Sequence, residues 1–346
     1  MLRVGLVGIG FMGWMHYLAY QRSKRATLVA FASRDAAKRA GDWRGIKGNF
    51  GPPGEQIELG DLHVHESLEA MLADDQIDMI DICLPPHLHV SAACAALRAG
   101  KHVLCEKPLA LNTADCDRIL EEAITNERTV LVAQVLPYMG QYQYAYEVLQ
   151  GSEYGQPLGG YFKRTISPPD WIPDFYEADR VGGPLIDLQV HDAHFIRLAY
   201  GMPQQVMCLA EMKAGIVKYC HTLMRFEDPR VVVATSGGVS NQTSRPFTHG
   251  MELQFEKATL QFELAVFKDG LEVMPLKILT EDGRTLRPAL AAADEVEAFT
   301  NEIDDAAESI RLRACALRLD GRLARDAIHI CQCLQISAET GAWVNC

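Results

Sequence analysis

The feature that most constrains this chain is a glycine motif directly after its first apolar run. Residues 2–7 are rich in β-forming side chains, and Gly8-Ile9-Gly10-Phe11-Met12-Gly13 follows them and precedes a predicted helix at 14–23. In a βαβ unit, the first glycine permits a tight turn, the second lets a pyrophosphate approach, and the third lets helix and strand pack closely. The helix N-terminus adds N–H donors for the phosphates. The motif therefore predicts a dinucleotide site at Gly8, Gly10, Phe11, Met12 and Gly13, against the alternative of a tight turn that merely contains three glycines.

Short apolar runs alternate with helix-length segments through residue 135. We predict strands at 2–7, 27–32, 77–84, 102–105 and 129–133, and helices at 14–23, 88–99 and 113–125. This order is typical of a doubly wound parallel sheet with helices on both faces, so residues 1–135 are predicted to form a Rossmann domain. The Gly-rich stretch 41–60 is polar and interrupted by turn residues, so we expect an inserted surface loop there.

The pattern changes in the rest of the chain, residues 136–346. A helix is predicted over 184–200 and another over 321–339, the latter a candidate to pack back on the first domain. Between them come strand-like runs at 206–212, 220–226, 230–236, 251–255, 259–264 and 273–279. Consecutive strands joined by turns favour an antiparallel sheet. The fold class is therefore α/β for the first domain and α+β for the second.

The end of the second strand bears on the cofactor. An acidic residue there would accept hydrogen bonds from both adenosine ribose hydroxyls and favour NAD, but the sequence has Ser33 and Arg34, followed by Asp35. Arg34 can pair with a 2′-phosphate and Ser33 can donate a hydrogen bond, which favours NADP over NAD. Alternatively, Ser33 or Asp35 caps the next helix and Arg34 is solvated.

Two further loops follow strands at the same sheet edge. We predict that Leu84, Pro85 and His89 contact the nicotinamide side of the cofactor; the alternative is a turn whose prolines start the next helix. The two histidines of this loop, His87 and His89, are expected to be polar loop residues rather than metal ligands. Glu106 and Lys107 end the strand at 102–105. Lys107 is expected to bind a substrate hydroxyl and stabilise developing charge, with Glu106 paired to it or on the nicotinamide ribose, unless this is an exposed Lys-Pro turn.

Asp187 and His191 open the helix of the second domain. They are four residues apart and so share one helix face, where a carboxylate can orient an imidazole for general base chemistry. The alternative is an ordinary surface pair. His194 continues this face and could complete a metal site, but no further ligand cluster is evident, so we predict no metal. Trp171, Phe175 and Tyr176 are expected in the core, with a sugar-pocket role as the alternative.

The net charge and the cysteine content limit the binding partners and the cellular setting that we expect for this chain. The net charge is −12, which disfavours nucleic acid or an anionic membrane as the main partner. No apolar run approaches the roughly 18 residues of a membrane span. Ten cysteines are scattered without a CxxC pair, and Cys83, Cys94 and Cys105 lie in apolar stretches. This pattern predicts a reducing cytoplasmic setting without disulfides.

Together these segments resemble the Gfo/Idh/MocA family, the relatives of glucose-fructose oxidoreductase and inositol dehydrogenase. The resemblance is carried by residues 8–13, 99–109, 182–192 and 336–341. It implies a Rossmann domain plus an α+β domain whose large open sheet mediates homodimers or homotetramers. It also implies Lys107, Asp187 and His191 as active-site residues, NAD or NADP as cofactor, and a sugar, polyol or related cyclic alcohol as substrate.

The expected activity is an NAD(P)-dependent dehydrogenase acting on CH–OH groups. His191 would take the hydroxyl proton while hydride leaves for the nicotinamide. Two alternatives stay open: a glycosidase or lyase of the same family that recycles its nicotinamide, and a non-catalytic cofactor-binding sensor. The chain departs from the family in the long 41–60 stretch and in the absence of an arginine within Gln134–Tyr138.

Overall fold

The computed structural model describes residues 1–48, 50–169, 172, 174–290 and 294–346. The chain divides into two compact units, the first made of Met1–Met139 and Ala292–Arg325 and the second of Gly140–Ala291 and Asp326–Cys346. The first unit therefore also contains residues 292–325, which the predicted division after residue 135 had assigned to the second domain. No helix in the described part of the chain is long and apolar enough to cross a membrane.

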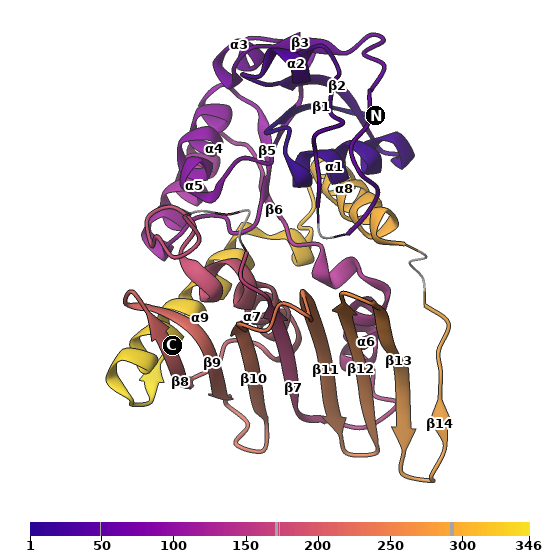
Figure 1. Cartoon of the computed structure of the whole chain (residues 1–346), viewed down its shortest axis with the longest axis vertical. Coiled ribbons are helices and arrows are strands. Elements are labelled where there is room, and N and C mark those ends of the chain that lie inside the picture. The colour runs from indigo at the N-terminus through magenta and orange to yellow at the C-terminus, as the bar shows by residue number, and fades with distance from the viewer. Residues whose placement is uncertain (49, 170–171, 173, 291–293) are drawn as a thin grey trace. The chain divides into compact units, whose positions relative to one another are not determined.

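The first unit is built on a six-stranded parallel sheet (Figure 1). Its order is β3-β2-β1-β4-β5-β6, which confirms the predicted doubly wound fold. The order reverses direction between β1 and β4, and ligands of such sheets bind outside the carboxyl ends of the strands at this point. The strands are β1 (Leu2–Val7), β2 (Ala26–Ala32), β3 (His63–His65), β4 (Met79–Ile82), β5 (His102–Glu106) and β6 (Val130–Ala133).

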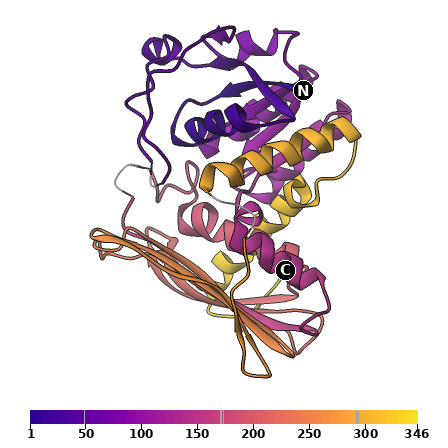
Figure 2. The same cartoon turned by 90° about the vertical axis from the view of Figure 1, so that its right-hand side faces the viewer.

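Helices cover both faces of this sheet (Figure 2). On one face α1 (Phe11–Arg22) contacts α8 (Glu295–Leu312), and on the other α4 (His89–Arg98) contacts α5 (Thr113–Thr125). Helix α8 was not predicted from the sequence; Asp294 caps its N-terminus by accepting from the backbone N–H of Glu297. The short helices of the unit are α2 (Ala36–Arg39), α3 (Leu68–Leu72), η1 (Pro86–Leu88), η2 (Leu136–Tyr138) and η4 (Leu317–Leu319).

Most described residues of the stretch 41–60 are exposed and irregular, as predicted for a surface loop, but Trp43, Ile46 and Ile57 are buried in the core. Trp43 is fully buried and makes edge-on ring contacts with Trp14, Tyr17 and Phe31. Trp14 in turn donates from Nε1 to the carbonyl of Pro52 at 2.9 Å. The described residues of the stretch are irregular and mostly polar, but a few large apolar side chains anchor the segment against α1 and β2.

The second unit contains a nine-stranded sheet in the order β14-β13-β12-β11-β7-β10-β9-β8-β15 (Figure 1). Only β7 and β10 pair in parallel; the other pairs are antiparallel, as predicted. The strands are β7 (Pro157–Ile166), β8 (Gln205–Lys213), β9 (Ile216–Arg225), β10 (Val232–Val239), β11 (Phe247–Phe255), β12 (Ala258–Phe267), β13 (Gly270–Thr280), β14 (Thr285–Leu286) and β15 (Val344–Asn345).

Helices of the second unit pack on one face of this sheet. Tyr142 of α6 (Gly140–Gln150) contacts Phe262 of β12, and Phe195 of α7 (Val190–Tyr200) contacts Phe162 of β7. The long helix α9 (Gly321–Thr340) belongs to the first unit up to Arg325 and to the second unit beyond it. Strand β7 was not predicted from the sequence, because its first residues include Pro157, Gly159 and Gly160, which are poor strand residues.

Candidate active site

The three glycines of the β1–α1 turn have three different surroundings. Gly8 has φ of +97°, and a Cβ there would lie 2.3 Å from the carbonyl oxygen of Cys83. A Cβ on Gly13 would lie 2.1 Å from the Gly8 oxygen, whereas one on Gly10 would have nothing within 4 Å. Gly8 and Gly13 are therefore needed by the fold, while Gly10 borders open space at the N-terminus of α1.

The N-terminus of α1 is suited to an anion. Among the described residues no side chain caps it, and Gly10 stands at the N-cap. The N–H groups of the first turn, which includes Phe11 and Met12, therefore remain for a ligand's phosphates. The ammonium of Lys38 adds positive charge here, since its Nζ donates to the carbonyl of Ile9 at 2.6 Å. Lys38 was not predicted from the sequence, because only the fold brings α2 to the turn between β1 and α1.

The residues that follow β2 have different contacts. Asp35 caps α2 by accepting from the N–H groups of Ala37 and Lys38, as the alternative interpretation predicted. Arg34 is exposed, and Ser33 is half-buried. Arg39 donates to the carbonyls of both Ser33 and Arg34 and so holds this turn in place. The turn thus presents a cation and a hydroxyl, with its single carboxylate already engaged as a helix cap.

His89 is not a polar loop residue, so that interpretation was wrong. It is fully buried at the start of α4. Its ring nitrogens lie 2.7 Å from the carbonyl oxygens of Leu84 and Pro108. The imidazole therefore ties the segment after β4 to the segment after β5. Burial lowers the pKa of His89, while the hydrogen bonds to the two carbonyl groups act in the opposite direction.

Glu106 and Lys107 stand at the carboxyl end of β5, beside β4 in the sheet. Glu106 is buried, and its carboxylate accepts from the backbone N–H of Lys107 at 2.8 Å. Its other oxygen lies 3.4 Å from Nε2 of His16, which comes from α1. This pairing with α1 fixes the backbone from which the half-buried Lys107 side chain extends.

A buried polar cluster lies below this edge. Nδ1 of His16 is 2.8 Å from the Asp81 carboxylate, which also accepts from Tyr20. Burial alone would lower the pKa of His16, but the Asp81 carboxylate raises it well above its ordinary value. Glu302 of α8 is fully buried nearby, and burial raises its pKa well above the usual range. Neither Glu302 oxygen has a hydrogen-bond partner within the described chain. The cluster therefore favours a protonated, neutral Glu302.

Asp187 and His191 lie on a helix that is not a regular α-helix. Residues Leu185–Gln189 form a π-helical turn, η3, which continues into α7. A π-turn inserts an extra residue into the helix and is frequent at functional sites. Both side chains are half-buried. The next residue, Asp192, is buried and accepts from the Arg164 guanidinium of β7 at 2.9 and 3.0 Å, which anchors this helix on the sheet.

His194 does not support the competing metal site. It is fully buried, and burial lowers its pKa to about 3, so it is a neutral core histidine. Among the described residues, ligand atoms gather within 4.8 Å of one another at two other places, His16/Asp81/Cys83 and His63/His65/Asp74. Asp187, His191 and His194 form no such group.

The remaining predicted core residues are aromatic side chains and cysteines. Phe175 is buried in a small apolar cluster, as expected, and Tyr176 is partly buried against it. Trp171 lies outside the described residues. Cys94 and Cys105 are buried as predicted, Cys83 is partly buried, and none of the ten cysteines forms a disulfide.

Comparison with known proteins covers both units. Residues 2–134 match the GFO_IDH_MocA model, described as an oxidoreductase family with an NAD-binding Rossmann fold. Residues 142–261 match the model of the GFO/IDH/MocA C-terminal domain.

Individual relatives are distant but extend over much of the chain. The D-xylose 1-dehydrogenase (NADP(+)) 2 of Haloferax volcanii is 24% identical over 348 residues, covering 99% of this chain and 98% of the relative. The myo-inositol 2-dehydrogenase of Thermotoga maritima is 26% identical over 203 residues, 58% of this chain and 55% of the relative. The solved structure of levoglucosan dehydrogenase with NADH and L-sorbose has a TM-score of 0.80 at 19% identity, covering 99% and 98% of the two chains, and so shares the fold.

Proposed function

The chain belongs to the Gfo/Idh/MocA family of oxidoreductases, and on that premise we propose that it transfers a hydride between NAD(P) and a secondary alcohol of a sugar, polyol or related cyclic alcohol. The observation that carries the proposal lies within the first unit. Strands β1, β4 and β5 are neighbours, and their carboxyl ends bring the open turn at Gly10 and the Glu106-Lys107 pair to one sheet edge.

The chain's own residues fit a dinucleotide. Gly10 leaves room for a pyrophosphate, Gly8 and Gly13 keep the turn tight, and the uncapped start of α1 offers N–H donors. Leu84 and Pro85 follow β4, the strand next to β1, and would face the nicotinamide side. NAD(P), when bound here, supplies the hydride acceptor.

Protein side chains supply the proton chemistry. His191 takes the proton from the substrate hydroxyl as general base. The Lys107 ammonium donates a hydrogen bond to the same oxygen and stabilises the charge that develops as it becomes a carbonyl. Asp187 orients His191 or the substrate, and Glu106 holds the Lys107 backbone. The π-turn at Leu185–Gln189 supports this assignment, since such turns are frequent at functional sites.

NADP is the favoured cofactor in this proposal. The exposed Arg34 and the nearby Ser33 suit a 2′-phosphate, and Asp35 is engaged as a helix cap. The Haloferax relative is named for NADP, while the levoglucosan dehydrogenase structure holds NADH, so relatives use both cofactors.

The open sheet of the second unit supports a homodimer or homotetramer. Tyr161 and Leu223 both flank Ala234 in register and thus share one sheet face. This face, opposite the helices, exposes large apolar side chains, namely Tyr161, Leu209, Leu223 and Val232. Such a face fits a partner subunit. The free cysteines accord with the proposed cytoplasmic setting.

A cofactor-reduction screen over sugars and polyols, with NAD and NADP in parallel, tests the activity. We expect reduction with at least one substrate, and loss of turnover with retained cofactor affinity in Lys107→Met and His191→Asn. Lys24→Met is a matched control for Lys107→Met, because its side chain is exposed and lies outside the proposed site.

The outcomes separate the alternatives. Product formation without net reduced cofactor would replace hydride transfer by the cofactor-recycling glycosidase or lyase reaction. Cofactor binding without turnover on the whole panel would favour the sensor. Unchanged turnover in both site variants would remove Lys107 and His191 from the chemistry.

A further inference from the structure

We propose that His63, His65 and Asp74 form a binding site for a divalent transition metal ion, zinc being the ion that the donors fit best. Nδ1 of His63 lies 2.7 Å from Oδ2 of Asp74, and Nε2 of His65 lies 3.3 Å from the same oxygen. The three ligand atoms lie within 4.8 Å of one another. None of these residues takes part in the proposed hydride transfer, so the inference stands independently of it.

The backbone places the two histidines for this purpose. They are two residues apart on β3, so their side chains leave the strand on the same face. Asp74 follows α3 and comes to that face from a different part of the first unit. Two imidazoles and one carboxylate are a donor set that zinc accepts, and it leaves coordination positions for water.

The separations are close to those of a metal site. Zinc–ligand bonds of about 2.0–2.2 Å in a tetrahedron place neighbouring ligand atoms about 3.3–3.5 Å apart. The His65–Asp74 distance of 3.3 Å already has this value. The His63–Asp74 distance of 2.7 Å is that of a hydrogen bond and must lengthen by about 0.6 Å, a shift open to a half-exposed surface side chain.

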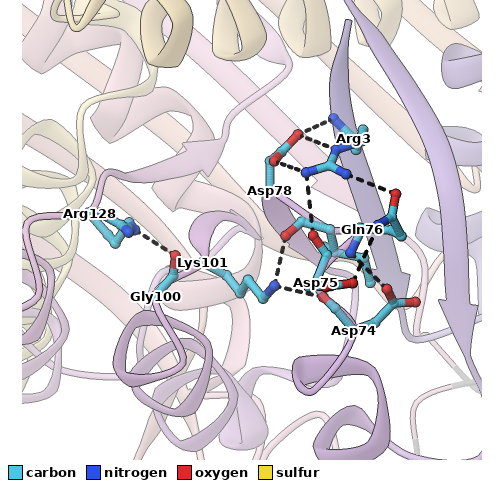
Figure 3. A network of polar contacts seen from close by, with 9 residues as sticks. Arg3, Asp74, Asp75, Gln76, Asp78, Gly100, Lys101 and Arg128 are labelled. Atoms are coloured by element: carbon cyan, nitrogen blue, oxygen red, sulfur yellow. Dashed lines mark hydrogen bonds and ion pairs between the residues drawn. The ribbon is translucent and has the colours of Figure 1, made fainter.

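Surrounding contacts hold the carboxylate in place (Figure 3). Oδ1 of Asp74 accepts from the backbone N–H of Gln76 at 2.9 Å, so Oδ2 is the oxygen turned to the histidines. The buried ammonium of Lys101 donates to the carbonyls of Asp74 and Ile77 at 2.7 and 2.8 Å. Such outer contacts orient metal ligands and raise affinity.

The site has one open side. The Asp74 side chain is 10% exposed and that of His65 19%, whereas His63 is 52% exposed. An ion can therefore enter past His63 and keep water ligands. Once bound, it would join the short edge strand β3 to the segment before β4. The backbone carbonyl of His65 also accepts from the N–H of Ser33, which follows β2. Metal binding should thus stabilise the first unit.

The test is zinc binding to the full chain after chelator treatment, by calorimetric titration and by thermal melting with Zn²⁺ alone. We expect one bound ion and a higher melting temperature with Zn²⁺, and no such effect with Mg²⁺, which prefers oxygen ligands in an octahedron. Co²⁺ in place of Zn²⁺ should give visible d–d absorption that reports imidazole ligation.

Variants separate this site from accidental binding. His63→Ala and Asp74→Asn should each weaken zinc binding by at least about 10–100-fold. Loss of an outer-sphere partner already has an effect of this size, and these variants change a ligand itself. Cys315→Ser is the matched control, because this exposed thiol beside Asp320 is another surface side chain of a type that binds zinc. Metal-free melting curves show whether each variant folds. Zinc affinity unchanged in the first two variants, or lost only in Cys315→Ser, would overturn the proposal and leave His63, Asp74 and His65 as a hydrogen-bonded clip.

Discussion

Single substitutions of the three glycines between β1 and α1 can distinguish a residue needed for cofactor binding from residues needed for folding. A Cβ at Gly10 would meet nothing within 4 Å, and its φ of −111° is accessible to alanine. We therefore expect Gly10→Ala to change the free energy of unfolding by no more than about 1 kcal/mol. The methyl group would occupy the approach of the pyrophosphate, so NAD(P) affinity should fall at least about tenfold, or roughly 1.4 kcal/mol.

Gly13→Ala and Gly8→Ala should behave differently. Their Cβ atoms would lie 2.1 and 2.3 Å from backbone carbonyl oxygens, and Gly8 also has a positive φ. Backbone cannot yield as a flexible side chain does, so each substitution should destabilise the fold by about 1–3 kcal/mol or more.

Urea denaturation followed by circular dichroism gives the stability of each variant, and titration of NADPH fluorescence gives its affinity. We expect Gly10→Ala to lose cofactor affinity but not stability, and the other two variants to lose stability. A Gly10→Ala protein that is strongly destabilised, or that binds NADPH as tightly as the unmodified chain, would refute the assignment of Gly10 to the pyrophosphate.

Three further predictions concern the first unit. Trp43→Ala should cost about 3–5 kcal/mol in urea denaturation because the indole is fully buried; a loss below about 1 kcal/mol would mean that 41–60 is dispensable to the core. Burial raises the pKa of Glu302 in the folded protein, so its neutral form contributes to the free energy of unfolding. This contribution is fully present below the unfolded pKa of 4.5, and it decreases by about 1.4 kcal/mol per pH unit as the pH rises toward the folded pKa. Glu302→Gln should therefore raise the melting temperature more at pH 8 than at pH 5, and an equal change at both would contradict this. Arg34→Ala should weaken NADPH binding by about 10–100-fold, leaving NADH binding and the melting temperature unchanged, because the side chain is exposed and would contact only the 2′-phosphate; equal losses for both cofactors would contradict the preference for NADP.

Local sequence determined the parts of this protein whose cause lies within a few neighbouring residues. Alternating apolar runs predicted β1, β4 and β5, and the motif at Gly8, Gly10 and Gly13 predicted the turn between β1 and α1. Strand periodicity and turn residues likewise predicted most of the antiparallel sheet. In each case hydrogen bonding and backbone geometry act over short stretches of chain, so their signal is readable in order along the sequence.

Tertiary structure alone decided which distant side chains meet. Trp43 lies in a mostly polar stretch of sequence, yet its ring packs against Trp14 of α1 and Phe31 of β2. His16 and Glu302 are separated by most of the first unit's sequence, and only the packing of α1 on α8 buries them together. The histidines of β3 likewise meet Asp74 only when α3 folds back along the sheet. The burial of a side chain depends on residues that are distant in the sequence. Its pKa and its partners depend on the same residues, so a local sequence pattern cannot predict them.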